Sequence, residues 1–313
     1  MIDVAHLSKH YGNKVAVDDL TFQVRPGIVT GFLGPNGAGK STTMRMMVGL
    51  DAPTSGTVTV NGHDYRRLRA PLHDVGTMLE AHAIHTGRSA YHHLLAMAQT
   101  HAIPVARVHE VIELVGLESV ARKRVGSFSL GMGQRLGIAA ALLGDPGTVI
   151  LDEPANGLDP EGILWIRNLL KGLAREGRTV FLSSHLMSEI ALTADHVVVI
   201  GRGRLVIDAS VDEVVAQAST NAAILVRSER SEELARALAG PGVAVEHHGR
   251  DTIEVHGLTG RQIGEVAVRE RIVLDELTPR QASLEDAFMA LTGDSVEYRT
   301  STASELADIV EAA

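Results

Sequence analysis

The stretch from Gly34 to Ser41 reads Gly-Pro-Asn-Gly-Ala-Gly-Lys-Ser and fits the phosphate-loop pattern G-x-x-x-x-G-K-[ST] at every fixed position. Its three glycines let the backbone turn so that successive N–H groups can converge on a polyphosphate. Lys40 supplies a mobile positive charge for the β- and γ-phosphates, and the Ser41 hydroxyl is placed to hold Mg²⁺. These residue types at this spacing predict a nucleoside triphosphate site.

The phosphate loop must lie between a strand and a helix, and its flanks predict both. The run from Ile28 to Leu33 is short and mostly apolar, which suits a buried strand. The run from Thr42 to Leu50 is rich in Met, a good helix former, and Gly49 stands near its end. The alternative is an ordinary glycine-rich turn, which the agreement of the octapeptide with its flanks disfavours.

Polar side chains follow three further predicted strands. Glu80 follows Val75 to Leu79, the pair Asp152-Glu153 follows Thr148 to Leu151, and Ser184-His185 follows Thr179 to Ser183. Strands that alternate with helices predict parallel βαβ units, whose ligands bind at the carboxyl ends of the strands. We therefore expect these groups and the phosphate loop to meet in one crevice.

The acidic pair can divide the chemistry of that crevice. Asp152 complements Ser41 as an oxygen ligand for Mg²⁺, and Glu153 can orient or deprotonate an attacking water. The alternative for adjacent acids is a solvated turn, which the apolar strand before them disfavours. His185 could contact the γ-phosphate, although a lone His after a strand is more often structural. Tyr11, in a predicted turn, could stack on a purine, although a half-buried turn Tyr is equally ordinary.

Composition excludes several other classes of function. The 313 residues carry a net charge of −9, which argues against bulk attraction to nucleic acid or anionic lipid. The chain has no Cys, so it forms no disulfide and no zinc-thiolate site. We see no secretory signal peptide and no apolar run of about 18 residues. Histidines crowd residues 82–101, but without ligand spacing we favour a docking surface or solvated side chains over a metal site.

The predicted organisation is a large α/β domain over residues 1–218 with a helical segment at about 86–145. In that segment Thr86 is expected to cap a helix from Arg88 to His101, and Pro104 to open a helix through Val115. An apolar helix is expected from Gln134 to Leu143. Strands are expected from Ile2 to Val4 and from Leu20 to Val24, flanking a turn at residues 11–14.

A turn-rich stretch at 219–221 predicts a boundary before a second, smaller domain over residues 222–295. Its predicted element order is β-α-β-β-α-β, the ferredoxin-like α+β pattern. A capping box formed by Thr259 and Gln262 strengthens its second helix. Ser283 and Asp286 are expected to open a further helix through Leu291, and residues 296–313 to form an acidic tail.

Taken together, these motifs resemble the nucleotide-binding subunits of ABC transporters over roughly residues 1 to 218. Tyr11 matches the base-stacking position, and Asp152 and Glu153 match Walker B and the catalytic glutamate. Residues 155–159 match the D-loop, 128–132 the signature, and His185 the switch histidine. The resemblance implies a P-loop NTPase cassette with a RecA-like core, an antiparallel β subdomain and an α-helical subdomain.

Two positions differ from the commonest family pattern, and they indicate a particular group within the family. Glu80 stands where the Q-loop usually has Gln, and the signature reads Phe-Ser-Leu-Gly-Met. Both departures are similar to exporter ATPases of the bacitracin, lantibiotic and daunorubicin resistance type. The small C-terminal domain and the stretch from Ser283 to Met289 are similar to that group too, which extends the resemblance to nearly the whole chain.

The resemblance implies the cofactors ATP and Mg²⁺ and a complete set of site residues. The catalytic residues would be Glu153, His185 and Glu80, and the metal ligands Ser41, Asp152 and Glu80. The nucleotide would be bound by Tyr11, Gly34, Pro35, Asn36, Gly37, Ala38, Gly39, Lys40, Ser41, Thr42, Ser129, Gly131 and Asp159. Ser129 and Gly131 would act on the nucleotide of a second copy, so the family geometry implies a head-to-tail homodimer around two ATP molecules.

The implied partner is a separate polytopic membrane permease, with this chain on the cytoplasmic face of the membrane and with no nucleic acid bound. The leading hypothesis is an ATP hydrolase that drives an exporter of a drug, antibiotic, peptide or lipid. A soluble ABC ATPase acting on ribosomes or DNA is the alternative, but such chains usually join two cassettes or insert a coiled coil, and this chain has no heptad run. An import ATPase is a third hypothesis, against which Glu80 and Met132 argue mildly.

Overall fold

The computed structural model describes residues 1–80, 84–219 and 223–279. The helix expected after Ser283 and the expected tail at 296–313 lie outside these ranges. The described chain forms two compact units, of which the first is Met1–Ser210 and the second begins at Val211. Helix α8 (Val211–Ser219) therefore belongs to the second unit, ahead of the boundary at 219–221 that we expected from the sequence.

The centre of the first unit is a sheet of strand order β5-β6-β7-β3-β8-β9. Its strands are β3 (Val29–Leu33), β5 (Val75–Met78), β6 (Thr148–Leu151), β7 (Thr179–Ser183), β8 (His196–Gly201) and β9 (Arg204–Ser210). Neighbouring strands are parallel from β5 to β8, and β9 is antiparallel to β8. Because β5, β6, β7 and β3 are parallel neighbours, the segments that follow them emerge at one edge of the sheet. This arrangement was predicted from the sequence and is confirmed.

A second, antiparallel sheet has the order β2-β1-β4, formed by β1 (Ile2–Tyr11), β2 (Lys14–Val24) and β4 (Ser55–Val60). Helix α1 (Lys40–Met47) contacts β2 and β4, and its buried methionines share one hydrophobic cluster with both sheets. In this cluster the rings of Phe22, Phe32 and Phe181 lie 5.1 to 6.1 Å apart, centroid to centroid. The core therefore fixes the start of α1, and with it the loop that precedes the helix.

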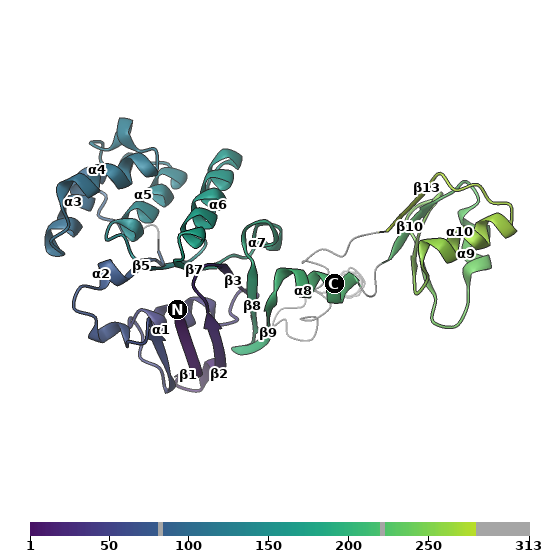
Figure 1. Ribbon diagram of the computed structural model, residues 1–313, viewed down its shortest axis with the longest axis horizontal. Coiled ribbons are helices and arrows are strands. Elements are labelled where there is room, and N and C mark those ends of the chain that lie inside the picture. Colours follow the sequence, from purple (N-terminus) through teal and green to yellow (C-terminus); the bar gives the residue numbers. More distant parts are fainter. Residues whose placement is uncertain (81–83, 220–222, 280–313) are drawn as a thin grey trace, which may run out of the picture. The chain divides into compact units, whose positions relative to one another are not determined.

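Helices α3 (Ala90–Thr100), α4 (Val105–Leu114) and α5 (Leu130–Leu142) gather at one end of the unit, away from β1 and β2 (Figure 1). The expected cap of the first of these helices was wrong, because Ser89 and not Thr86 accepts the hydrogen bond from His92 N. The chain before Ser89 is tied elsewhere, since the carbonyl of Thr86 accepts a bond from Gly126 N at 3.0 Å. The helix therefore begins two residues later than the sequence pattern suggested.

Helix α5 begins at Leu130, with Ser129 as its N-cap, rather than at Gln134 as expected. The Ser129 hydroxyl accepts a bond from Met132 N at 3.3 Å, and this cap offsets the poor helix propensity of the two glycines that follow. Most later residues of α5 are buried, so tertiary packing decides its length. The signature glycine Gly131 consequently lies inside the helix.

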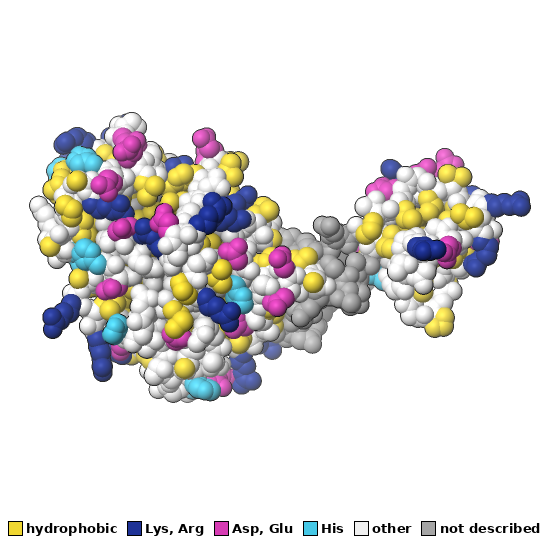
Figure 2. All heavy atoms as spheres, viewed as in Figure 1, with side chains coloured by type: hydrophobic (Ala, Val, Ile, Leu, Met, Phe, Trp, Pro, Cys, Tyr) yellow, Lys and Arg dark blue, Asp and Glu magenta, His cyan; other side chains and the backbone are white. Residues whose placement is uncertain are grey.

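Helices α6 (Pro160–Arg175) and α7 (Met187–Thr193) both contact β3, and α6 also contacts β7. The remaining helical segments of the unit are α2 (Pro71–Asp74) and the 3-10 turns η1 (Tyr65–Arg67), η2 (Glu118–Val120) and η3 (Val125–Ser127). Within the described ranges no helix is both long and apolar enough to cross a membrane. On the face drawn in Figure 2, acidic and basic side chains of the first unit are interspersed.

The second unit continues with β10 (Ile224–Arg227), α9 (Ser231–Leu238), β11 (Ala244–His247), β12 (Thr252–His256), α10 (Gly260–Arg269) and β13 (Glu276–Pro279). The strands form an antiparallel sheet of order β11-β12-β10-β13, and its buried residues pack with those of the two helices. The predicted β-α-β-β-α-β order is confirmed, as is the capping box of Thr259 and Gln262.

Candidate nucleotide site

The phosphate loop connects β3 to α1, as its flanks predicted, and two of its glycines are required by close backbone approaches. A Cβ on Gly34 would lie 2.4 Å from the carbonyl oxygen of Ile200, and one on Gly39 would lie 2.5 Å from that of Ala16. Gly39 also has a φ of 104°, which residues with side chains rarely adopt. Substitution at either position would displace the backbone that must approach the phosphates.

Lys40 is buried against its own loop. Its ammonium group donates hydrogen bonds to the carbonyls of Gly34 at 2.6 Å and Pro35 at 3.3 Å. Burial lowers the pKa of Lys40, and the nearby carboxylates of Glu153 and Asp152 oppose this shift. The side chain is thus held at the loop by weak carbonyl acceptors, which an anionic polyphosphate would replace with stronger, charge-assisted bonds.

The side chains expected to hold Mg²⁺ meet across the crevice. Ser41 Oγ donates a hydrogen bond to Asp152 Oδ2 at 3.0 Å, and Ser183 Oγ donates one to Asp152 Oδ1. A hydroxyl beside a carboxylate is a donor set that suits a hard cation, so these residues fit the metal that the family resemblance implies. Ser183 had not been singled out from the sequence, because a Ser that ends an apolar strand carries no signal of its own.

Glu153 and His185 also come together. His185 Nδ1 lies 2.8 Å from Glu153 Oε2, and the two side chains are 51% and 27% exposed. A carboxylate and an imidazole in contact, open to solvent and one residue beyond the metal ligand, form an arrangement that can orient a water and pass a proton. The structure thereby joins the ends of β6 and β7 in one site with the phosphate loop.

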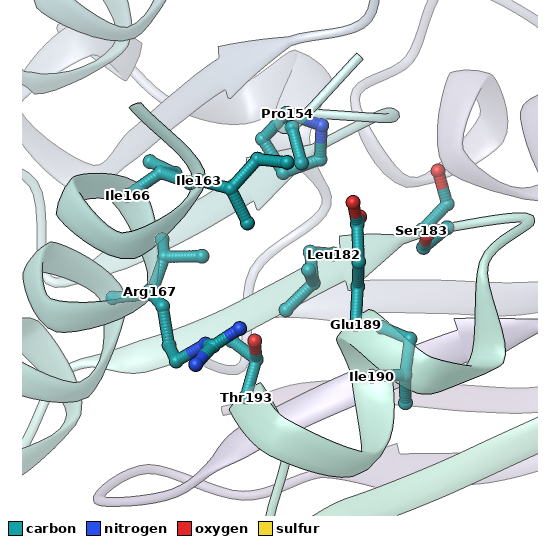
Figure 3. Close-up of a pocket in the computed structure, with 12 residues that line it drawn as sticks. Pro154, Ile163, Ile166, Arg167, Leu182, Ser183, Glu189, Ile190 and Thr193 are labelled. Atoms are coloured by element: carbon teal, nitrogen blue, oxygen red, sulfur yellow. The ribbon is translucent and has the colours of Figure 1, made fainter. Parts of the chain in front are cut away.

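A small cavity lies between α6 and α7, and Ser183 at the end of β7 also lines it (Figure 3). It has a volume of about 20 Å³, which is room for one water molecule. Glu189 lines it, and burial raises the pKa of this carboxyl, with Glu153 adding to the rise and His185 opposing it. Arg167 Nε is buried there without a hydrogen-bond partner among the described residues. The sequence had not indicated that Glu189 and Arg167 line a common cavity.

Glu80 follows β5 and is exposed on a groove of about 440 Å³. Ser41, Asp152 and Arg45 line the same groove, together with Ile84 and residues of α3 and α5. Glu80 is therefore in the same crevice as the expected metal ligands, as its place at a strand end predicted.

Tyr11 stands beside α1, with 47% of the residue exposed. Its hydroxyl donates to Asp51 Oδ2 at 3.0 Å, and Asp51 in turn forms a salt bridge with Arg45 of α1 at 2.8 Å. The ammonium of Lys9 lies 4.8 Å from the ring centroid. The hydroxyl and the Lys9 contact thus position the ring, while about half of the residue remains exposed to solvent. This arrangement suits stacking on a base.

The remaining predicted residues lie on another part of the unit. Ser129 is exposed at the start of α5, and Asp159 caps α6 by accepting a bond from Gly162 N at 2.9 Å. Gly131 packs against Gly157, whose carbonyl oxygen would lie 3.0 Å from a Cβ at 131. The contact of Gly131 joins the signature segment to the D-loop segment, and no contact given above for these three residues runs to the phosphate loop of the same chain.

Comparisons with known proteins agree with this geometry. Residues 17–156 match the family model described as ABC transporter, and residues 222–285 match a domain of unknown function (DUF8746). The chain is 38% identical over 301 residues to the bacitracin transport ATP-binding protein BcrA of Bacillus licheniformis, covering 94% of this chain and 97% of that protein.

Two further similarities each cover about two thirds of the chain. The chain is 34% identical over 212 residues to the lantibiotic transport ATP-binding protein SrtF of Streptococcus pyogenes, covering 68% of this chain and 92% of that protein. A solved structure of an ATP-binding subunit of an ABC transporter aligns with a TM-score of 0.64 and 27% identity, over 69% of this chain and 92% of that chain.

Proposed function

This chain belongs to the family of ABC transporter ATP-binding proteins, and we propose that it is the subunit of an exporter that binds and hydrolyses ATP. The observation that carries the proposal is the crevice in which Lys40, the Ser41–Asp152 pair and the Glu153–His185 pair meet. The names of the relatives favour an antibiotic or a peptide as the exported substrate. Export of a drug or a lipid would need the same ATPase, so these substrates are the alternatives.

ATP binding follows from the loop and its neighbours. The N–H groups of residues 36–39 and the positive end of α1 attract the phosphates, and Lys40 exchanges its carbonyl acceptors for phosphate oxygens. Tyr11 stacks on the base. Mg²⁺, held by Ser41 and Asp152 with Glu80 nearby, would neutralise charge on the β- and γ-phosphates.

Hydrolysis is assigned to the Glu153–His185 pair. Glu153 orients or deprotonates the attacking water, and His185 holds the carboxylate in place and contacts the γ-phosphate. The charge of Glu80 beside the phosphates tunes the rate. Each of these groups stands at the end of a strand of the parallel sheet, so the sheet fixes their mutual distances.

The proposed working form is a homodimer. Ser129 and Gly131 present a hydroxyl and a helix N-terminus to solvent, a combination suited to a γ-phosphate. Gly131 contacts the D-loop segment and Ser129 caps its own helix, so we assign both to the ATP held by a second copy packed head to tail. ATP then favours the closed dimer, and loss of the γ-phosphate loosens it.

The proposed membrane partner is a separate permease, which would place the chain at the cytoplasmic face of the membrane. Its docking site is assigned to the groove beside Glu80, whose walls include Met97 and His93 of α3. Burial, aided by the charge of Arg88, lowers the pKa of His93, so this wall is neutral and partly apolar. Ser41 and Asp152 also line this groove. A segment of the permease bound there would therefore lie next to the proposed metal ligands.

Copurification tests the role in transport. A tagged chain, expressed in its source cells, should bring down a membrane protein with several predicted spans and then hydrolyse ATP. Charge-reversing substitution of Arg45 in the groove should release that partner while leaving the tagged chain folded. Recovery of ribosomes or DNA instead, with no membrane protein, would favour the soluble ATPase and overturn the exporter.

A further inference from the structure

The backbone of Glu153 is in an unusual conformation and is held from both sides. Its φ is +51°, in the left-handed region that residues other than Gly seldom occupy without support from their surroundings. Its N–H donates to Ser183 Oγ at 3.0 Å, and its carbonyl oxygen accepts a bond from Gln134 Nε2 at 2.7 Å. One of these supports comes from β7 and the other from α5.

Gln134 is almost completely buried, with 3% exposure, and lies on α5 just beyond the helix start at Ser129. The first turn of α5 also contacts the chain that follows Glu153. A Cβ on Gly157 would lie 2.2 Å from Leu130 Cδ2, and the φ of +75° at this position also disfavours a side chain. Helix α5 therefore contacts the segment that contains Glu153 through two residues, Gln134 and Leu130.

We infer that Gln134 is a positioning residue through which α5 sets the place of the Glu153 carboxylate. The inference rests on the proposed function, in which Ser129 at the start of α5 meets nucleotide in one site and Glu153 activates water in the other. Because a helix moves as a stiff element, displacement of its first turn moves Gln134 with it. The backbone of Glu153 follows the hydrogen bond, and the carboxylate changes its position relative to His185.

The first test replaces Gln134 with Leu, which removes the donor and keeps the bulk. We expect kcat for ATP to fall roughly tenfold, which corresponds to one hydrogen bond at a strained residue, with KM changed less than about twofold. Gln134→Glu keeps the side-chain length but sets a carboxylate against the carbonyl, and should be at least as slow. Gln134→Lys restores a donor of sufficient length and should recover part of kcat.

Arg107→Leu is the matched control. Arg107, on α4, donates to the carbonyl of Leu142 at 2.9 Å, at the opposite end of α5. This substitution loosens the same helix without touching the segment of Glu153, and kcat should remain within about twofold of wild type.

The Glu153→Gln variant distinguishes a positioning role of Gln134 from a merely structural one. There, adding Gln134→Leu should leave ATP affinity and ATP-dependent dimer formation unchanged, because the carboxylate whose position it sets is already absent. Loss of affinity or of the dimer in this background would overturn the inference, as would wild-type kcat in Gln134→Leu. If Glu153→Gln itself hydrolyses ATP normally, the proposed catalytic role fails as well. If Glu153→Gln is inactive and Gln134→Leu is normal, only this inference fails.

Discussion

Ser41 and Asp152 are 111 positions apart in the sequence, yet the hydroxyl of one donates to the carboxylate of the other at 3.0 Å. Ser41 lies in the first turn of α1, and Asp152 follows the buried strand β6. The hydrogen bond therefore connects the phosphate-loop side of the crevice to the acidic pair, and it marks the place where a hard cation would bind.

Ser183→Ala should weaken the metal site. It removes the bond to Asp152 Oδ1 and the acceptor for Glu153 N–H, so the Mg²⁺ concentration for half-maximal ATPase activity should rise roughly 10- to 100-fold. Ser184→Ala is the matched control, because Ser184 Oγ accepts a bond from Leu186 N and leaves Asp152 untouched. Equal Mg²⁺ titrations of the two variants would contradict the role given to Ser183.

Tyr11→Ala should weaken ATP binding through loss of base stacking. Stacking of a base on an aromatic ring contributes about 1–3 kcal/mol, so the Kd measured by calorimetry should rise roughly 5- to 150-fold. Tyr11→Phe keeps the ring and removes the hydroxyl with its bond to Asp51, and its Kd should stay near that of wild type. A Phe variant as weak as the Ala variant would show that the hydroxyl, and not stacking, carries the affinity.

Lys40 gives ATP binding a dependence on pH. Burial holds its pKa below the ordinary 10.5, and bound phosphates should raise it. Between the lowered value and 10.5 the unfolded chain holds more protons than the folded one, so the contribution of Lys40 to stability rises with pH there. In that window ATP binding takes up a proton, and affinity should fall as pH rises.

Calorimetry in two alkaline buffers of different ionisation enthalpy checks this uptake. The apparent binding enthalpy should differ between the buffers. The measurement uses Tyr11→Phe, so that the Tyr11 phenol does not titrate in the same range. Identical enthalpies in the two buffers would show that the Lys40 ammonium is fully protonated before ATP arrives.

Glu80→Gln should change turnover more than affinity. The substitution removes one charge from the groove that contains Ser41 and Asp152 but keeps an oxygen for metal or water. Steady-state kinetics should show a changed kcat with a similar KM. An unchanged kcat would remove the tuning role given to this residue.

The sequence predicted the parts of the site that local chemistry specifies. The phosphate loop has a fixed pattern, and Asp152 and His185 follow short apolar runs that are typical of buried strands. The rule that parallel strands present their carboxyl ends together then placed these groups in one crevice, and the register of β6 and β7 agrees.

The features that the sequence did not predict are those decided by contacts between distant segments. Ser89 caps α3 because residues 125 and 126 hold the chain before it, and no local pattern separates Ser89 from Thr86 as a cap. Likewise, the parts played by Ser183 and Gln134 depend on where Asp152 and Glu153 come to lie. A polar residue in an apolar stretch is informative only once its partner is known.

The central claim is that each copy binds ATP from one side and that its twin completes the pocket. The most direct measurement is the mass of the Glu153→Gln variant by light scattering at saturating ATP and Mg²⁺. We predict twice the mass of the chain, reverting to the monomer when ADP replaces ATP or when Ser129→Arg is added. A variant that stays monomeric while calorimetry shows the nucleotide site filled would contradict the account.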